Sequence, residues 1–480
     1  MTSSSKPGRR PLVPVVSMAL IALVVAACDE EGDADGAQDR FRSEVGPVPE
    51  TPQRPGDAQA GYRALVNEPY VSCGMPYSAY RRLTPETDPA DLLPGREGRN
   101  AELPYHLTAH TNADGVEVVS SNCLLCHAAH FDGELVVGLG NEFLDFTTNP
   151  RALVNQVGAY VRGEGDTAAW QHWADRVEGI APYVQTSTVG ANPATNLTWA
   201  LMAHRDPATL AWSSEPLLEP PPREPLPVSV PPWWRMQKKH AMFYTTIGRG
   251  DHGRFMLLAA MLCADTVEEA EAADSYAADI RAFIASLEPP EYPFPIDAAL
   301  AEEGRQVFEA TCSSCHGTYG EAPSYPNLVV ALDVVGTDPA YATAATDGSR
   351  DRFYEWAARS PYGDDVRLAP AEGYIAPPLD GVWATAPYLH NGSVPDIRSL
   401  LDSRLRPTFW RHEQPRDYDA TILGWRYERL EHGKDQAADR EERARIYDTT
   451  RPGYGNGGHL FGDGLTDAER DAVIEYLKTL

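Results

Sequence analysis

The chain has 480 residues, a net charge of −28 and only seven cysteines. A chain of this length can fold into two or three domains, and its strong negative charge disfavours nucleic acid as a partner. Seven cysteines are too few for a disulfide scaffold. The 41 prolines and 38 glycines predict long loops between the secondary-structure elements.

Residues 1–28 have the pattern of an export signal. A lysine and two arginines precede an apolar run over residues 11–27, which ends in two alanines before Cys28. This pattern is typical of a bacterial lipoprotein signal, in which the cysteine receives the lipid. We therefore expect a periplasmic or cell-surface protein that is held at the membrane only by a lipid on Cys28. Residues 29–60 are rich in acidic residues, glycine and proline, and they are predicted to form a disordered acidic tether.

Two later segments carry the attachment motif of c-type haem. The pattern C-x-x-C-H occurs twice, with these cysteines and histidines: Cys123, Cys126 and His127, and Cys312, Cys315 and His316. On a helical turn the two thiols and the imidazole share one face, so the thiols can bond a haem edge while the imidazole binds the iron. A structural zinc site normally needs four ligands, and no βαβ pattern supports a thioredoxin-like dithiol. The sequence therefore predicts two covalently bound c-type haems with His127 and His316 as proximal ligands.

The apolar periodicity predicts an all-α protein of two cytochrome c-like haem domains with long Pro/Gly-rich loops. Apolar residues at helical spacing lead into Cys312, and a capping box at Thr466 opens a helix that would close the second domain. A comparable helix around residues 280–287 stops before a pair of prolines. We therefore expect an N-terminal haem domain over residues 61–290 and a C-terminal cytochrome c domain over residues 291–480.

The sixth ligand of each iron decides between an electron carrier and an enzyme. None of the eight methionines follows His316, so the C-terminal domain cannot supply a methionine ligand. His459, in a glycine-rich loop before the last helix, is the leading candidate. His390 could instead be the ligand or contact one, while His412 and His432 are expected in an exposed, charged insertion. Ligation by two histidines would give an electron relay of low potential.

The first iron has no obvious sixth ligand in the sequence. Either it has no protein ligand on that side, or the ligand is one of nine residues of the N-terminal unit: His172, His204, His240, His252, Met202, Met236, Met242, Met256 and Met261. Proximity in the sequence does not choose among these alternatives.

The segment 231–240 places Trp233 and Trp234 directly before cationic residues. One interpretation is an ordinary cation–π surface or the edge of a core. The other is a contact between the haems, in which a tryptophan bridges the electron path and an arginine or lysine pairs with haem propionates. Both interpretations stay open at the level of the sequence.

Cys73 and Cys263 are the cysteines left over once lipid and haem are assigned. In an oxidising compartment they could form one disulfide. The alternative is that they are two separate buried thiols.

The order of these motifs resembles the di-haem cytochromes of the bacterial cytochrome c peroxidase and MauG superfamily, in particular its rubber-oxygenase-like branch. The resemblance spans roughly residues 61–480. The most specific stretch is Ala-Pro-Tyr-Leu-His-Asn-Gly-Ser-Val-Pro, which contains His390. Six stretches carry the resemblance: residues 122–127, 231–240, 248–251, 312–320, 383–395 and 457–462.

The resemblance implies an all-helical pair of haem domains with different tasks. The N-terminal haem, with His127 proximal, would activate oxygen or peroxide, and the C-terminal haem would be a bis-His electron relay through His316 and His459. His390 would belong to a motif at the domain junction, and Trp233 or Trp234 would lie between the haems; with His127 these are the expected catalytic residues. A calcium ion between the domains is left open.

The expected function is thus that of an exported haem-dependent oxidoreductase, dioxygenase-like or peroxidase-like. Its partners would be a periplasmic redox protein or a small apolar substrate with oxygen or peroxide. The alternative is a non-enzymatic electron-transfer lipoprotein in which both irons are six-coordinate.

Overall fold

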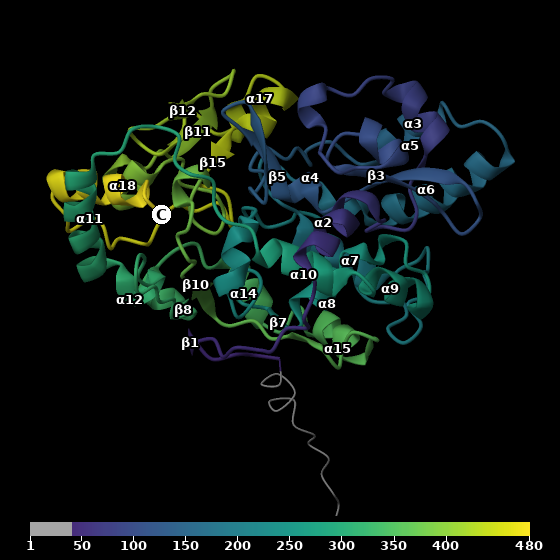
Figure 1. Ribbon diagram of the computed structural model, residues 1–480, viewed down its shortest axis with the longest axis horizontal. Helices are drawn as coiled ribbons and strands as arrows, with labels where there is room; N and C mark the ends of the chain where they lie inside the picture. The colour runs from purple at the N-terminus through teal and green to yellow at the C-terminus, as the bar shows by residue number, and fades with distance from the viewer. Residues whose placement is uncertain (1–40) are drawn as a thin grey trace, which may run out of the picture.

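The computed structural model describes residues 41–480 (Figure 1). The predicted export signal, the lipid site at Cys28 and the first part of the predicted tether lie outside these residues. The structure is 38% helical and 13% strand, and its strands form several small sheets. The prediction of an all-α fold is therefore wrong.

The helices are mostly short, and the longest, α6, has 21 residues. The α-helices of the described chain are α2 Ala58–Asn67, α3 Tyr77–Leu83, α4 Leu124–His127, α5 Arg151–Gly158, α6 Glu164–Val184, α7 Ala194–Ala203, α8 His252–Met256, α9 Val267–Asp274, α10 Ala277–Ala285, α11 Ala298–Thr311, α12 Ser313–His316, α13 Leu332–Val335, α14 Ala340–Thr346, α15 Asp351–Arg359, α16 Ile397–Leu401, α17 Arg440–Arg445 and α18 Asp467–Leu477. Single 3-10 turns are η1 Pro89–Asp91, η2 Gly98–Glu102, η3 Trp233–Lys238, η4 Ala260–Leu262, η5 Val382–Ala384, η6 Ser403–Leu405 and η7 Lys434–Gln436.

The strands have two to five residues and pair antiparallel in groups of two or three. In sheet order they are β1 Gly46–Pro47, β8 Leu328–Ala331 and β10 Gly373–Ile375; β14 Tyr427–Arg429, β11 Phe409–His412 and β15 Tyr447–Asp448; β12 Tyr418–Asp419 and β13 Gly424–Trp425; β2 Met75–Pro76, β4 Glu117–Ser121 and β3 Leu107–Thr111; β5 Ala128–Phe131 and β6 Glu134–Val137; β7 Gly248–Gly250 and β9 Val366–Leu368.

These strands lie inside connections that the sequence predicts as loops. The hairpin β5–β6 follows directly on the first haem motif, and Asp132 and Gly133 at its turn both have positive φ, 49° and 81°. An Asp-Gly pair is a strong signal for a two-residue hairpin, because such turns match the twist of the strands they join. Helical periodicity alone does not reveal segments this short.

Two helix pairs repeat one geometry in the two halves of the chain. Helices α11 and α18 pack together at one end of the molecule (Figure 1), where an added Cβ on Gly304 would lie 1.8 Å from the carbonyl oxygen of Ala472. Helices α2 and α10 pack likewise, and a Cβ on Gly61 would lie 1.9 Å from the carbonyl oxygen of Asp279. Glycine at each crossing lets the two backbones touch. The predicted helix before Cys312 and the predicted capping box of the last helix are both confirmed.

Short strands pair across the two halves of the chain, residues 61–290 and residues 291–480. Strand β7 of the first half pairs with β9 of the second, so the predicted domain limit at residue 290 does not separate the sheets. Residues 41–57, predicted as tether, also pack on the body: Val48 is buried, and Arg54 forms ion pairs with Asp251 and Asp274. A few apolar and basic residues thus fix a segment whose composition predicts disorder. Within residues 41–480 no helix combines the length and apolar character needed to cross a bilayer.

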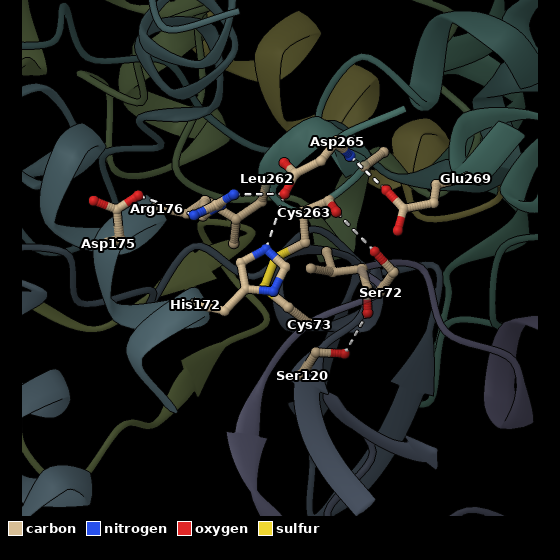
Figure 2. Close-up of a disulfide and its surroundings, with 12 residues drawn as sticks. Ser72, Cys73, Ser120, His172, Asp175, Arg176, Leu262, Cys263, Asp265 and Glu269 are labelled. Atoms are coloured by element: carbon tan, nitrogen blue, oxygen red, sulfur yellow. Dashed lines mark hydrogen bonds and ion pairs between the residues drawn. A yellow bond between two sulfur atoms is a disulfide. The ribbon is translucent and has the colours of Figure 1, made fainter. Parts of the chain in front are cut away.

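Cys73 and Cys263 form a disulfide that links positions 190 residues apart (Figure 2). Their Cα atoms are 5.5 Å apart, and both side chains are buried. Beside the bond, Asp265 accepts hydrogen bonds from His172 and Arg176, which project from α6. The disulfide fastens the segment before β2 to Cys263, and the charged cluster fastens α6 to Asp265, just after η4.

Candidate functional site

The second motif lies on a single helical turn that continues α11. Cys312 lies between α11 and α12 and caps both, so both cysteines and His316 follow one another around that turn. The Nδ1 of His316 donates a hydrogen bond to the carbonyl oxygen of Pro377 at 2.8 Å. A carbonyl can only accept, so the proton sits on Nδ1 and Nε2 is left free to bind a metal.

His459 faces His316 at the distance expected when two imidazoles bind one metal ion from opposite sides. The two ring centres are 6.2 Å apart. Two imidazoles that bind one metal from opposite sides, each through a bond of about 2.0–2.1 Å, place their ring centres roughly 6.3 Å apart. Burial lowers the pKa of His316, and burial with the nearby His316 and Arg406 lowers the pKa of His459 to about 4. Both rings are therefore neutral at pH 7, the form that binds a metal.

The loop that presents His459 is held in one conformation. His459 has a φ of 48°, and its backbone N–H donates to the carbonyl oxygen of Val335 at 2.6 Å. Gly458 before it has a φ of 72°, and an added Cβ would lie 2.1 Å from the carbonyl carbon of Gly336. Only glycine fits at that position. The glycine-rich sequence is thus what allows His459 to reach the site.

One cavity contains the second motif, His459 and two cations, of which Arg235 is buried and Lys239 is half-buried. Its wall includes Cys312, Cys315, His316 and His459, together with apolar side chains of α11 and α18 and the cations Arg235 and Lys239. Arg235 is 7% exposed and donates to the carbonyl of Asp380 and to the hydroxyl of Thr385, not to a carboxylate.

The neighbouring lysines differ in their partners. Lys238 pairs with the carboxylate of Asp380 at 2.6 Å, whereas no ion pair forms between Lys239 and any described residue. Burial lowers the pKa of Lys239 to about 8. Buried cations need an anionic partner, and the propionates of a haem are carboxylates. Two thiols, two facing imidazoles and two cations that pair with no carboxylate of the described residues fit a c-type haem in this cavity.

The first motif is fixed by two asparagines. Asn122 accepts a hydrogen bond from the N–H of Leu124, and the N–H of Asn141 donates to the carbonyl of Cys126 at 2.8 Å. The ring of His127 stacks on Trp233 with 4.8 Å between ring centres. Burial lowers the pKa of His127 to about 4, so this imidazole is also neutral at pH 7.

The two adjacent tryptophans belong to different cores. Trp233 packs with Leu124 and with Ile280 of α10, around the first motif. Trp234 packs with Phe308 and other residues around the second motif, and its Nε1 donates to the carbonyl of Asp380. Turn η3 therefore connects the surroundings of the two motifs through neighbouring indoles, which favours the inter-haem interpretation of this segment.

The structure narrows the candidates for the sixth ligand of the first iron. Met236 and Met256 pack in the same cluster as Cys123, whereas Met202, Met242 and Met261 pack in another core.

Among the histidines, His172, His204 and His240 each form a hydrogen bond through a ring nitrogen, to Asp265, Ser213 and Val48 respectively. His252 is 1% exposed, and neither ring nitrogen has a partner among the described residues. A hydrogen bond at one ring nitrogen leaves the other nitrogen free, as at His316, so the four histidines stay open and the packing narrows only the methionines, to Met236 and Met256.

His390 lies in the wall of the cavity that contains the second motif, and its ring packs against an aromatic ring. It stacks on Tyr374 with 4.0 Å between ring centres, and burial lowers its pKa to about 3. Its Nε2 is buried without a hydrogen-bond partner in the described chain. Tyr374 and the buried carboxyl Glu142 line the same cavity, and the sequence analysis missed both because neither lies in a haem motif.

His412 is not exposed as predicted. Its ring packs between Phe143 and Trp410, and burial lowers its pKa to about 3. The side chain of His432 is 35% exposed and lies 3.7 Å from Glu442. Across residues 41–480, no group of three or more His, Cys, Asp or Glu side chains is arranged to hold a metal ion.

A family comparison bears on the segment that carries His390. Residues 373–411 match the family model described as RoxA-like, cytochrome c-like. This match supports a cytochrome c-like domain at these residues, which implies a covalently bound c-type haem and suggests a haem-based redox function.

Two curated proteins of Sinorhizobium fredii are similar to this chain. Protein y4iM is 32% identical over 235 residues, which are 41% of this chain and 52% of that protein. Protein y4iJ is 31% identical over 260 residues, which are 40% of this chain and 41% of that protein. The matches therefore span about half or less of the length of these relatives.

Proposed function

We propose that this protein is a di-haem c-type cytochrome of the cytochrome c peroxidase and MauG superfamily that acts as an oxidoreductase. The N-terminal haem activates oxygen or peroxide, and the C-terminal haem, bound by His316 and His459, relays electrons. The observation that carries this proposal is the pair of neutral imidazoles whose centres are 6.2 Å apart above a C-x-x-C-H turn. The RoxA-like match over residues 373–411 supports it.

The presence of two haems is supported by the repeated helix geometry. Each motif is accompanied by a helix pair that crosses at a glycine, α2 with α10 and α11 with α18. His127 and His316 are each half-buried and each is the last residue of a short helix. We propose that each half of the chain, residues 61–290 and 291–480, holds one haem.

The side chains around each motif hold a redox centre and connect it to the other. A bound c-type haem supplies an iron that alternates between ferric and ferrous states and, with one axial position open, can bind a small oxidant. Pro377 orients His316, and Arg235 and Lys239 offset anionic charge in the cavity. Trp233 on His127 and Trp234 in the second core offer an aromatic route between the two sites.

Location and partners are part of the same proposal. Export, with a lipid on Cys28, would bring the chain to the periplasm or the cell surface, where c-type haem is attached in bacteria. A periplasmic redox protein, or a small apolar substrate with oxygen or peroxide, would be the reactant. The net charge of −28 supports a basic protein partner over nucleic acid.

The alternative is an electron-transfer lipoprotein with both irons six-coordinate. His252, with two unpartnered ring nitrogens, and the methionines beside Cys123 favour it. Electron paramagnetic resonance of the oxidised protein, with optical spectra after adding carbon monoxide or peroxide, separates the two. A high-spin signal and a spectral change on addition are expected for the oxidoreductase. Two low-spin haems that respond to neither addition would leave only the carrier.

A further inference from the structure

A cavity of about 780 Å³ lies beneath the proline-rich segment 219–226, and neither C-x-x-C-H motif contributes to its wall. This segment is named the strap, and the space beneath it the strap cavity. Helices α7, α14 and α15, in the lower half of the molecule as drawn in Figure 1, supply much of the remaining wall. Small-molecule sites usually have volumes of about 300–1,000 Å³. The strap cavity therefore has the size of a small-molecule site.

Hydrogen bonds hold the strap over the cavity. The guanidinium of Arg352 donates to the carbonyl oxygens of Glu219 at 2.8 Å and of Pro220 at 3.2 Å. The side-chain amide of Asn196, on α7, donates to the carbonyl oxygen of Pro222 at 2.8 Å. Because proline rings also fix the backbone φ, the strap is a rigid wall. The cavity beneath it is therefore already formed, so a ligand would not have to order this wall.

The strap cavity has an aromatic lining. The hydroxyl of Tyr341 is hydrogen-bonded to that of Thr195, and the hydroxyl of Tyr354 donates to the carbonyl oxygen of Ala345. These two tyrosines therefore offer a ligand mainly their rings. Aromatic and proline rings favour a flat, apolar ligand. Four aromatic side chains line the cavity: Tyr183, Trp199, Tyr341 and Tyr354.

Arg350 brings an unpaired positive charge to the strap cavity. Its guanidinium forms no hydrogen bond and no ion pair with any residue of the range 41–480, whereas the strap carbonyls occupy the guanidinium of Arg352. The side chain of Arg350 is half-buried, and burial lowers its pKa. A desolvated cation is stabilised by an anionic partner, and the planar fork of a guanidinium matches the two oxygens of a carboxylate.

The other charges of the wall limit the ligand to one negative charge. Glu219, Glu224 and Asp347 are exposed and line the same cavity. Three carboxylates beside one free guanidinium would repel a phosphate ester or another polyanion. A single carboxylate on Arg350 avoids most of that repulsion and leaves the rest of the ligand against the rings.

We propose that the strap cavity binds a small aromatic monocarboxylate, with its carboxylate on Arg350 and its ring against the tyrosines. The inference is independent of the proposed haem chemistry, because the lining of the strap cavity includes no cysteine and no histidine.

The test is isothermal titration calorimetry of the full, haem-loaded protein with benzoate and with benzyl alcohol, which has the same ring but no charge. Arg350→Gln removes the free guanidinium. Arg359→Gln is the matched control, because Arg359 is exposed at the other end of α15 and does not line the cavity. Ala344→Trp fills the cavity from α14 and leaves Arg350 in place. Optical spectra recorded during each titration show whether benzoate binds an iron instead.

We expect benzoate to bind saturably at one site per chain without changing the haem spectrum, and benzyl alcohol to bind at least tenfold more weakly. Arg350→Gln and Ala344→Trp should each weaken benzoate binding at least tenfold, and Arg359→Gln should stay within twofold of the unchanged protein. The proposal is overturned if benzoate gives no saturable heat, or if Arg350→Gln and Arg359→Gln bind it equally well. It is also overturned if Ala344→Trp binds benzoate as the unchanged protein does, or if binding is accompanied by a change in the haem spectrum that Arg350→Gln retains.

Discussion

Asp265 is the charged centre of the region around the disulfide, and replacing it by asparagine should destabilise the fold. Burial alone would raise the pKa of this carboxyl, but the hydrogen bond from His172 and the charges of Arg205 and Arg176 outweigh burial and lower the pKa to about 2. The carboxylate joins α6 to the segments that follow α7 and η4 (Figure 2).

The magnitude follows from the pKa shift. A carboxyl whose pKa is lower in the folded chain stabilises it above the unfolded pKa, near 3.9, and that contribution is lost as the pH falls through about 2. A shift from 3.8 to about 2 corresponds to roughly 2 kcal/mol, at about 1.36 kcal/mol for each pH unit. Asp265→Asn should therefore lower the free energy of unfolding by about 2 kcal/mol at pH 7 and by much less near pH 2.

Urea unfolding of the oxidised protein at pH 7 and at pH 2.5 measures this difference. Asp175→Asn is the matched control, because Asp175 also pairs with Arg176 but its side chain is 43% exposed. The control should change stability by no more than about 0.5 kcal/mol. The reasoning is refuted if Asp265→Asn and Asp175→Asn unfold alike at pH 7, or if the deficit of Asp265→Asn is as large at pH 2.5 as at pH 7.

Two further predictions concern the disulfide and the aromatic route. Cys73→Ser opens a link across 190 residues, and the chain-entropy model gives a loss of roughly 5 kcal/mol, seen as a lower urea midpoint; an unchanged midpoint would contradict a structural role. Trp233→Leu removes the ring that stacks on His127 and should slow electron transfer between the haems at least tenfold, as measured by flash photolysis. Trp212→Leu is the control, because Trp212 packs in neither of the clusters around the two motifs, and it should leave the rate unchanged. Equal rates in the two variants would exclude the route through Trp233.

The helices near the haem motifs could be predicted because their signals are local. The apolar spacing before Cys312 and the capping box at Thr466 lie within a few residues of the helices they specify. The strands could not be predicted in the same way. Strand β7 pairs with β9 across more than a hundred residues, and nothing near Gly248–Gly250 identifies that partner.

The site shows the same division between local and distant information. The two C-x-x-C-H turns and the loop position of His459 are visible in the sequence. The roles of three neighbouring cations are not, because only the folded chain pairs Lys238 with Asp380 and leaves Arg235 and Lys239 in the cavity. Likewise, a charged local sequence predicted His412 as exposed, whereas Phe143 from the other half of the chain covers its ring.

The measurement that tests the central claim most directly combines haem content with the spin state of the second iron. Mass spectrometry should find two covalently bound haems per chain, and electron paramagnetic resonance should show a low-spin signal that becomes high-spin in His459→Ala but not in the control His432→Ala. One haem per chain would contradict the di-haem proposal. A low-spin signal unchanged in His459→Ala would contradict ligation by His459 and leave His390 as the candidate.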